Sequence, residues 1–180
     1  MTDQVWGQFP APGAVRFERL LPGPIERVWS YLADSDLRGQ WLAPGLLESR
    51  AGGSLELSFR HSELSPQHED PPEGREGDGT RKVLRCEVLE IDPPHRLCFT
   101  WGAEAGASVV LFELTPVGAD VRLLITQSGL SPEHRVGVSN GWHTHLAILE
   151  DRANGRVPAA FWAIWKTLGG AYAERSQLQP

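Results

Sequence analysis

The fold is decided by residues 131–151, which have the sequence SPEHRVGVSNGWHTHLAILED and carry the features of a single long helix. Ser131 can accept hydrogen bonds from the free N–H groups at a helix start. Pro132 suits the first helical position, and Glu133 complements the positive end of the helix dipole. We therefore predict that a long helix begins here and that the strands predicted before it wrap around it.

The apolar residues of this predicted helix form one stripe. They recur at spacings of three and four residues, which places them on a single helical face that must meet a sheet. The stripe consists of Val138, Trp142, Leu146, Leu149 and Ala153. Gly137 and Gly141 each lower helix stability by roughly 1 kcal/mol relative to alanine. We therefore expect the first half of the helix to be where it frays, kinks or lets another backbone approach.

Most of the chain before this helix has the alternating apolar pattern of β-strands. We predict strands at residues 14–21, 46–49, 54–60, 81–91, 96–101, 108–116 and 120–128. A helix of about ten residues is predicted after Pro24, and a shorter one from Asp34 or Ser35 to Trp41. Residues 61–80 are rich in proline, glycine and acidic residues, which is typical of a long mobile loop.

A further amphipathic helix is predicted over residues 158–175. Its apolar residues again fall at spacings of four, three and four, and Gly169-Gly170 marks a potential early end. The stripe consists of Phe161, Trp165, Leu168 and Tyr172. An exposed stripe of this kind favours aggregation, so we expect the helix to dock on its own domain or on a second copy as a homodimer.

Composition narrows the classes of function. The 180 residues carry a net charge of −6 and no cluster of lysine or arginine, which argues against binding to nucleic acid or acidic membranes. No apolar stretch approaches the 18 or so residues of a membrane-spanning helix, and the N-terminus does not resemble a signal peptide. We expect a cytoplasmic protein in which Cys86 and Cys98 are reduced.

Five groups of residues occur in an order typical of one protein family. They are 24–34 with Trp41 and 43–44; 52–53; 90–94 with 97–101; 113–116 leading to 128–130; and 141–149. In these groups the chain resembles proteins similar to the activator of heat-shock protein 90 ATPase, within the START-like (SRPBCC, Bet v 1-like) superfamily that also holds polyketide cyclases. The resemblance extends over about residues 14–155.

The resemblance implies an α+β helix-grip fold. A curved antiparallel sheet of six to seven strands surrounds the long C-terminal helix, and two short helices follow the first strand. Residues 1–13 are then an N-terminal extension, 14–155 the START-like domain with its loop at 61–80, and 156–180 a helical extension outside the family pattern. The family often has a Trp-Trp doublet where this chain has Gln40-Trp41-Leu42, so one wall of a cavity is expected to differ.

A sheet curled around a helix leaves a concave apolar space, and such spaces are the usual sites of small molecules. We therefore expect a small apolar or aromatic ligand between the sheet and the long helix, with no cofactor. The residues predicted to contact it are Trp41, Phe59, Phe99, Trp101, Phe112, Trp142, His145 and Leu146.

The histidines of the long helix do not predict a metal site. His143 and His145 point about 200° apart, and His134 and His145 lie about 16 Å apart along the helix axis. There is also no GxSxG motif of a nucleophilic serine, so we expect binding rather than catalysis. A cyclase or dehydratase remains an alternative, because it needs only a polar group in an apolar cavity. Glu113 and His145 are the candidates for that role.

A chaperone-linked regulator is the other alternative, because the family is named after such a protein. Eukaryotic activators of the ATPase carry a separate N-terminal chaperone-binding domain, whereas thirteen residues precede the first predicted strand in this sequence. We therefore expect no stimulation of a heat-shock protein 90 ATPase.

Overall fold

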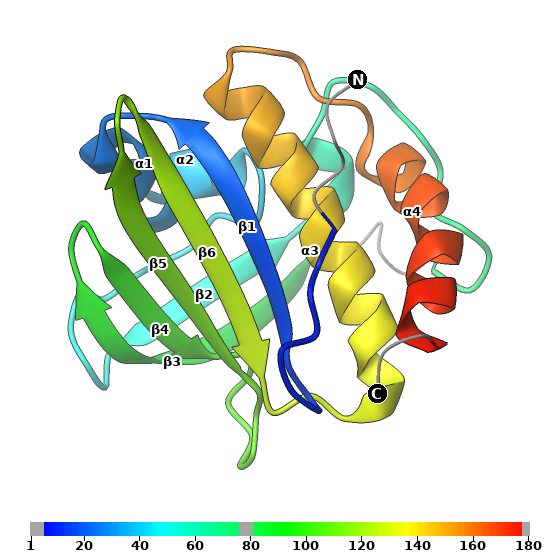
Figure 1. The fold of residues 1–180 in the computed structure, drawn as a ribbon, viewed down its shortest axis with the longest axis horizontal. Coiled ribbons are helices and arrows are strands. Elements are labelled where there is room, and N and C mark those ends of the chain that lie inside the picture. The colour runs from blue at the N-terminus through cyan, green and yellow to red at the C-terminus, as the bar shows by residue number, and fades with distance from the viewer. Residues whose placement is uncertain (1–5, 76–80, 178–180) are drawn as a thin grey trace.

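The structure, a computed structural model, describes residues 6–75 and 81–177 (Figure 1). Six antiparallel strands form one curved sheet in the order β1-β6-β5-β4-β3-β2. The strands are β1 (Val15–Pro22), β2 (Ser54–Phe59), β3 (Lys82–Asp92), β4 (Arg96–Thr100), β5 (Val109–Val117) and β6 (Asp120–Ser128). The helices are α1 (Ile25–Ala33), α2 (Ser35–Gly39), α3 (Pro132–Ala153) and α4 (Phe161–Gln177), with a 3₁₀ turn η1 (His61–Glu63). The predicted α+β helix-grip fold is confirmed.

The sheet is built from the alternating residues that the sequence indicated. The inward side chains of its central strands are buried, and they include Leu97 and Phe99 of β4, Phe112 of β5 and Leu123 of β6. Residues 46–49 do not join the sheet as a strand: only an isolated bridge pairs Leu47 with Leu55. The sheet therefore has six strands, the lower number of the predicted range.

The two short helices close one end of the sheet. Asp34 caps α2, because its Oδ1 accepts hydrogen bonds from the backbone N–H groups of Asp36 (3.0 Å) and Leu37 (2.9 Å). Arg38 is only 1% exposed and donates to backbone carbonyls on both sides of α2, those of Leu32, Ala33, Ala43 and Gly45. A buried guanidinium with this many acceptors fixes the corner that leads into β2.

Helix α3 begins at Pro132 as predicted, and its stripe packs against the concave face of the sheet. Trp142, Leu146, Leu149 and Ala153 are buried, and Val138 is partly buried. Ser131 occupies the capping position, but its hydroxyl contacts Nδ1 of His134 (2.8 Å) and accepts from no backbone N–H group. The prediction that this side chain caps the helix was therefore wrong. The helix runs without interruption past Gly137 and Gly141.

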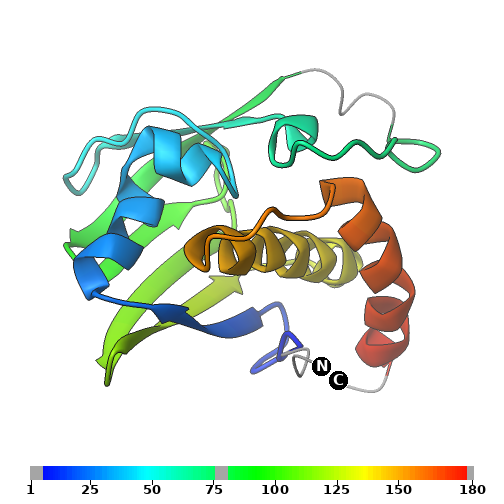
Figure 2. The ribbon, with the colours of Figure 1, turned by 90° about the horizontal axis from the view of Figure 1, so that it is seen from above.

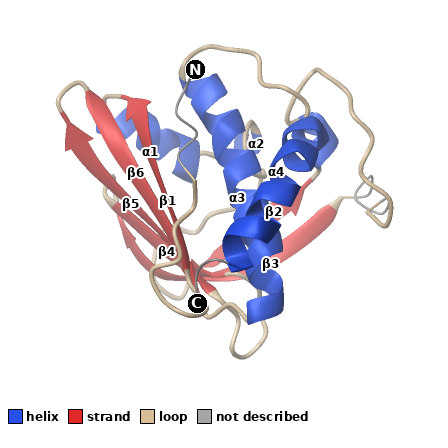
Figure 3. Cartoon of the chain, turned by 45° about the vertical axis from the view of Figure 1, so that its right-hand side comes forward, coloured by secondary structure: helices blue, strands red, loops and turns tan. Residues whose placement is uncertain are grey.

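Helix α4 packs on the side of α3 that the sheet leaves uncovered (Figures 2 and 3). The helix continues through Gly169 and Gly170, where the sequence indicated a potential early end. Tertiary packing outweighs the low helix propensity of glycine at these positions. A side chain at Gly169 would lie 3.3 Å from Nδ2 of Asn140, so a small residue allows the two helices to approach closely. Phe161, Leu168 and Tyr172 of the predicted stripe are buried within the chain, and Trp165 is partly buried.

The first part of the predicted loop, residues 61–75, contacts the helices. Leu64 is buried and its carbonyl accepts from Nη2 of Arg152 (2.8 Å), while Oγ of Ser65 donates to the carbonyl of Pro158 (2.7 Å). Residues 76–80 of that loop lie outside the described residues. None of the helices in the described ranges is both long and apolar enough to cross a membrane.

We expect removal of residues 156–180 to lower the melting temperature sharply. The truncation removes the buried side chains of α4 and leaves the polar face of α3 without its partners. The single change Leu168→Ala, at a buried position, should cost about 2–5 kcal/mol of unfolding free energy in urea titrations. Glu174→Ala, at an exposed position of the same helix, should change it by less than about 0.5 kcal/mol. A truncated protein that melts at the wild-type temperature would contradict the packing described here.

Candidate functional site

A cavity of about 1040 Å³ lies beside the first half of α3. The sheet side is formed by residues at the ends of strands, including Phe59, Leu84 and Gln127, and by Trp101 just after β4. The opposite side is formed by the first turns of α4, and His61 of the 3₁₀ turn adds to the wall. The site thus joins parts of the chain that are far apart in sequence.

One side of the cavity is formed by a row of residues on α3. Gly137, Gly141 and His145 line it at intervals of four residues, so they lie one above the other on the same helical face. A Cβ atom added at either glycine would meet nothing within 4 Å. At the two glycines we expected fraying, a kink or the close approach of another backbone, and the structure instead has an uninterrupted helix with open space beside it.

Six tryptophan and phenylalanine rings are also part of the wall. Trp101 lies 5.4 Å from Trp142 and 5.8 Å from Phe59, measured between ring centroids. On the side of α4, the cavity is lined by Phe161, Trp162 and Trp165. The ring of His61 stacks on that of Phe161 at 4.0 Å, with 13° between the planes. Offset and edge contacts of this kind hold the rings in fixed positions.

His145 is a buried polar side chain of the wall on the α3 side. It is 6% exposed, and its Nδ1 lies 2.7 Å from the backbone carbonyl oxygen of Trp41. Burial lowers the pKa of His145 from 6.5 to about 3, and the nearby His61 adds to the effect, while the bond to Trp41 opposes it. The ring is therefore neutral at physiological pH.

A second polar group is held on the sheet side. Nε1 of Trp142 donates to Oε1 of Gln127 (2.6 Å), and Nε2 of Gln127 donates to Oγ of Ser108 (2.8 Å). The indole N–H can only donate, so these two bonds fix the orientation of the Gln127 amide. The lining also includes charged side chains of both signs, those of Arg75, Lys82, Glu104 and Glu133.

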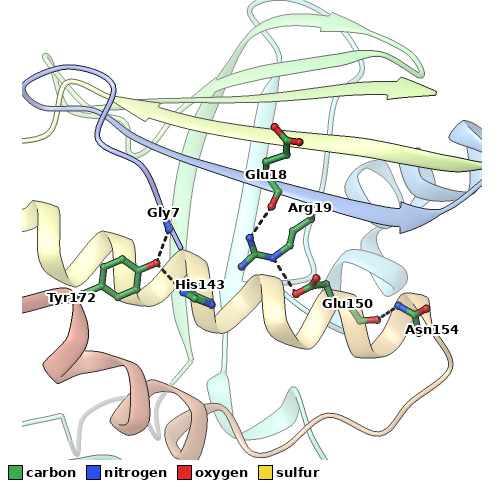
Figure 4. Close-up of polar contacts among 7 residues, drawn as sticks. All are labelled: Gly7, Glu18, Arg19, His143, Glu150, Asn154 and Tyr172. Atoms are coloured by element: carbon green, nitrogen blue, oxygen red, sulfur yellow. Dashed lines mark hydrogen bonds and ion pairs between the residues drawn. The ribbon is translucent and has the colours of Figure 1, made fainter. Parts of the chain in front are cut away.

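A separate buried cluster lies on another face of α3 (Figure 4). The Tyr172 hydroxyl accepts from the backbone N–H of Gly7 (3.0 Å) and lies 2.8 Å from Nδ1 of His143. Burial first, then the positive charges of Arg19 and Arg175, lower the pKa of His143 to about 4. Nearby, Nε of Arg19 pairs with Oε2 of Glu150 at 3.0 Å, which joins β1 to α3. His143 does not line the cavity.

The structure separates the eight predicted ligand contacts into two groups. Phe59, Trp101, Trp142 and His145 line the cavity. The other four, Trp41, Phe99, Phe112 and Leu146, are buried in the core behind that wall and do not line it.

Glu113, the other candidate acid or base, pairs with Arg96 (3.0 Å) and does not line the cavity. Sequence reasoning missed His61, Gln127 and the α4 residues as members of one site. The density of tryptophan in residues 161–165 was a signal for the last group. No three described His, Cys, Asp or Glu side chains are grouped so that they could hold a metal ion.

The two buried histidines of α3 predict a loss of stability in acid. Both have a folded-state pKa below the unfolded value of 6.5, so the unfolded chain binds more protons as the pH falls. Their contribution is complete above about pH 6.5 and is lost as the pH falls toward 4 for His143 and toward 3 for His145. We expect the unfolding free energy, measured in urea, to fall between pH 7.5 and 4.5.

The substitution His143→Gln should reduce this fall, because glutamine can accept from Tyr172 but does not titrate. His134→Gln, at an exposed position of the same helix, is the control and should leave the pH dependence as it is. Equal pH dependence of wild type and His143→Gln would contradict the assignment.

Comparison with known proteins agrees with this architecture. The family model described as Activator of Hsp90 ATPase homolog 1-like protein matches residues 22–154. A solution structure of a Bordetella parapertussis protein has a TM-score of 0.78 and 39% identity, covering 96% of this chain and 92% of that one. No curated protein matches the sequence.

Two more distant structures share the fold. The crystal structure of CalU16 from Micromonospora echinospora has a TM-score of 0.66 and 21% identity, covering 91% of this chain and 88% of that one. DynU16, a putative protein in the dynemicin biosynthetic locus, has a TM-score of 0.64 and 19% identity, covering 84% of this chain and 51% of that one. The resemblance inferred from the sequence is thus confirmed, and the chain belongs to the Activator of Hsp90 ATPase homolog 1-like family of the Bet v 1-like superfamily.

Proposed function

We propose that this protein binds a small aromatic molecule in the cavity between α3, α4 and the end of the sheet. The observation that carries the proposal is the row of Gly137 and Gly141 on α3, which faces open space and is surrounded by fixed aromatic rings. The volume of about 1040 Å³ lies just above the ~300–1,000 Å³ range of small-molecule sites.

The lining favours a flat aromatic ligand. The rings of Phe59, Trp101, Trp142, Phe161 and Trp162 line the cavity, and stacked or edge-on contacts between them and a ligand ring add to the gain from burying apolar surface. The lining charges include both Arg75 and Glu133, so they do not select strongly for a ligand of either sign. Shape and ring contacts are therefore expected to decide which molecules bind.

Binding accounts for His145 better than acid–base catalysis does. A general base works best when its pKa lies near the working pH, and burial lowers the pKa of His145 to about 3. An imidazole of such low basicity can accept a hydrogen bond but is a weak proton acceptor. Neither of the two side chains named from the sequence then suits a cyclase, since Glu113 lies outside the cavity.

Filling the cavity from α3 should abolish binding. Gly141→Leu places a side chain into the open space, and we expect the affinity for naphthalene, measured by quenching of tryptophan fluorescence or by calorimetry, to fall below detection. The same change should raise the unfolding free energy by about 1 kcal/mol, because leucine has a higher helix propensity than glycine. The substitution would then separate loss of function from loss of stability.

Gly170→Leu is the matched control. Gly170 is an exposed helical residue of α4, a Cβ there would also meet nothing within 4 Å, and it does not line the cavity. This variant should gain similar helix stability and bind naphthalene as the wild type does. If Gly141→Leu binds naphthalene like the wild type, or if the wild type does not bind it, the proposed site is wrong.

A further inference from the structure

His145 presents an unused hydrogen-bond acceptor to the cavity. A carbonyl oxygen can only accept, so the 2.7 Å contact between Nδ1 of His145 and the oxygen of Trp41 requires the ring proton to be on Nδ1. In the neutral ring Nε2 then has a lone pair and no hydrogen. The backbone of the α2–β2 connection therefore sets the tautomer of this side chain.

The lone pair of Nε2 is directed away from Trp41. The two ring nitrogens flank one carbon atom, so the directions in which they form hydrogen bonds diverge widely. No residue of the described chain forms a hydrogen bond with Nε2, although His145 is nine-tenths buried and lines the cavity. Nε2 is not among the fully buried side-chain atoms that lack a partner, so it is accessible from the cavity, and a ligand donor placed there gains a hydrogen bond that no described protein group makes.

The surroundings keep the acceptor neutral. The rings of Phe161, His61 and Phe59 lie 5.0, 5.5 and 6.1 Å from that of His145, between centroids. These neighbours exclude water from much of the ring and disfavour a second proton on it, in accord with the lowered pKa of His145. A neutral sp² nitrogen beside aromatic rings pairs best with a neutral hydroxyl group.

We propose that the ligand of this cavity is a neutral hydroxyl-bearing aromatic molecule whose O–H group donates a hydrogen bond to Nε2 of His145. The inference rests on the proposed function, because it names the chemistry of the molecule that the cavity binds. A ketone, ether or carboxylate oxygen at the same place would set its lone pairs against that of Nε2, so His145 also discriminates against such ligands.

Three probes of the same ring system test this with the full chain. Naphthalene has no polar group, 2-naphthol adds a donor, and 2-methoxynaphthalene keeps the oxygen but has no hydrogen to donate. By calorimetry at pH 7, 2-naphthol should bind about fivefold to tenfold more tightly than either of the others, the ratio given by one neutral hydrogen bond. The ¹⁵N resonance of Nε2 should shift with 2-naphthol and stay in place with naphthalene.

The substitution His145→Asn keeps an N–H group that can reach the Trp41 carbonyl but has no acceptor at the position of Nε2. It should reduce the ratio between the affinities for 2-naphthol and naphthalene from about fivefold to tenfold to about one, whatever the change in the wall does to naphthalene itself. His143→Asn, which changes the other buried histidine of α3 outside the cavity, should keep the preference for 2-naphthol.

The outcomes distinguish this inference from the proposed function. If wild-type protein binds naphthalene and 2-naphthol equally, or the methoxy compound as tightly as 2-naphthol, the role of His145 is refuted while the aromatic site stands. If none of the three binds, both proposals fail. Should His145→Asn not fold, the three-probe series and the Nε2 resonance of the wild type still decide, and a resonance that 2-naphthol does not move would refute the hydrogen bond.

Discussion

The burial of a polar helix face is the constraint on which the rest of the structure depends. Helix α3 is covered on opposite sides, and the side away from the sheet includes Asn140, His143 and Thr144, all buried. Buried polar groups must find hydrogen-bond partners. Nδ2 of Asn140 donates to the carbonyl of Trp165, and His143 contacts the hydroxyl of Tyr172, so α4 supplies two of the partners that this face requires. Oδ1 of Asn140 has no hydrogen-bond partner among the described residues.

The same contacts position the candidate site. Because α4 is held to α3 by hydrogen bonds at Trp165 and Tyr172, its first turns are fixed beside the cavity, where Phe161 and Trp162 complete the wall. The sheet holds Trp101 and Phe59 on the other side. Between them Gly141 leaves space that a larger residue would fill. Stability and the proposed binding therefore depend on different faces of one helix, which is why we expect that substitutions can change them separately.

Patterns in the sequence predicted most of the fold and part of the site. The Ser131-Pro132 start, the strand alternation and the stripe of α3 are local signals, and the structure follows them. Alternation indicates on which face of a strand a side chain lies, but not whether that side chain lines a cavity or packs in the core. For this reason Phe99 and Phe112 were predicted as ligand contacts, whereas the structure places them in the core behind the cavity wall. The role of α4 depends on the direction of the turn after Gly155, which no local pattern specifies. The end expected at Gly169-Gly170 was overridden by packing against α3.

The central claim is that an aromatic molecule occupies the space beside the glycine row of α3. A structure of the protein in complex with 2-naphthol tests it most directly. The account predicts the naphthalene ring over Gly141, between Trp142 and Phe161, with its hydroxyl group directed at Nε2 of His145. A naphthalene ring bound at the outer surface would contradict the proposed site. A ring bound inside the cavity, with its hydroxyl group directed at Gln127 and away from His145, would contradict the proposed hydrogen bond.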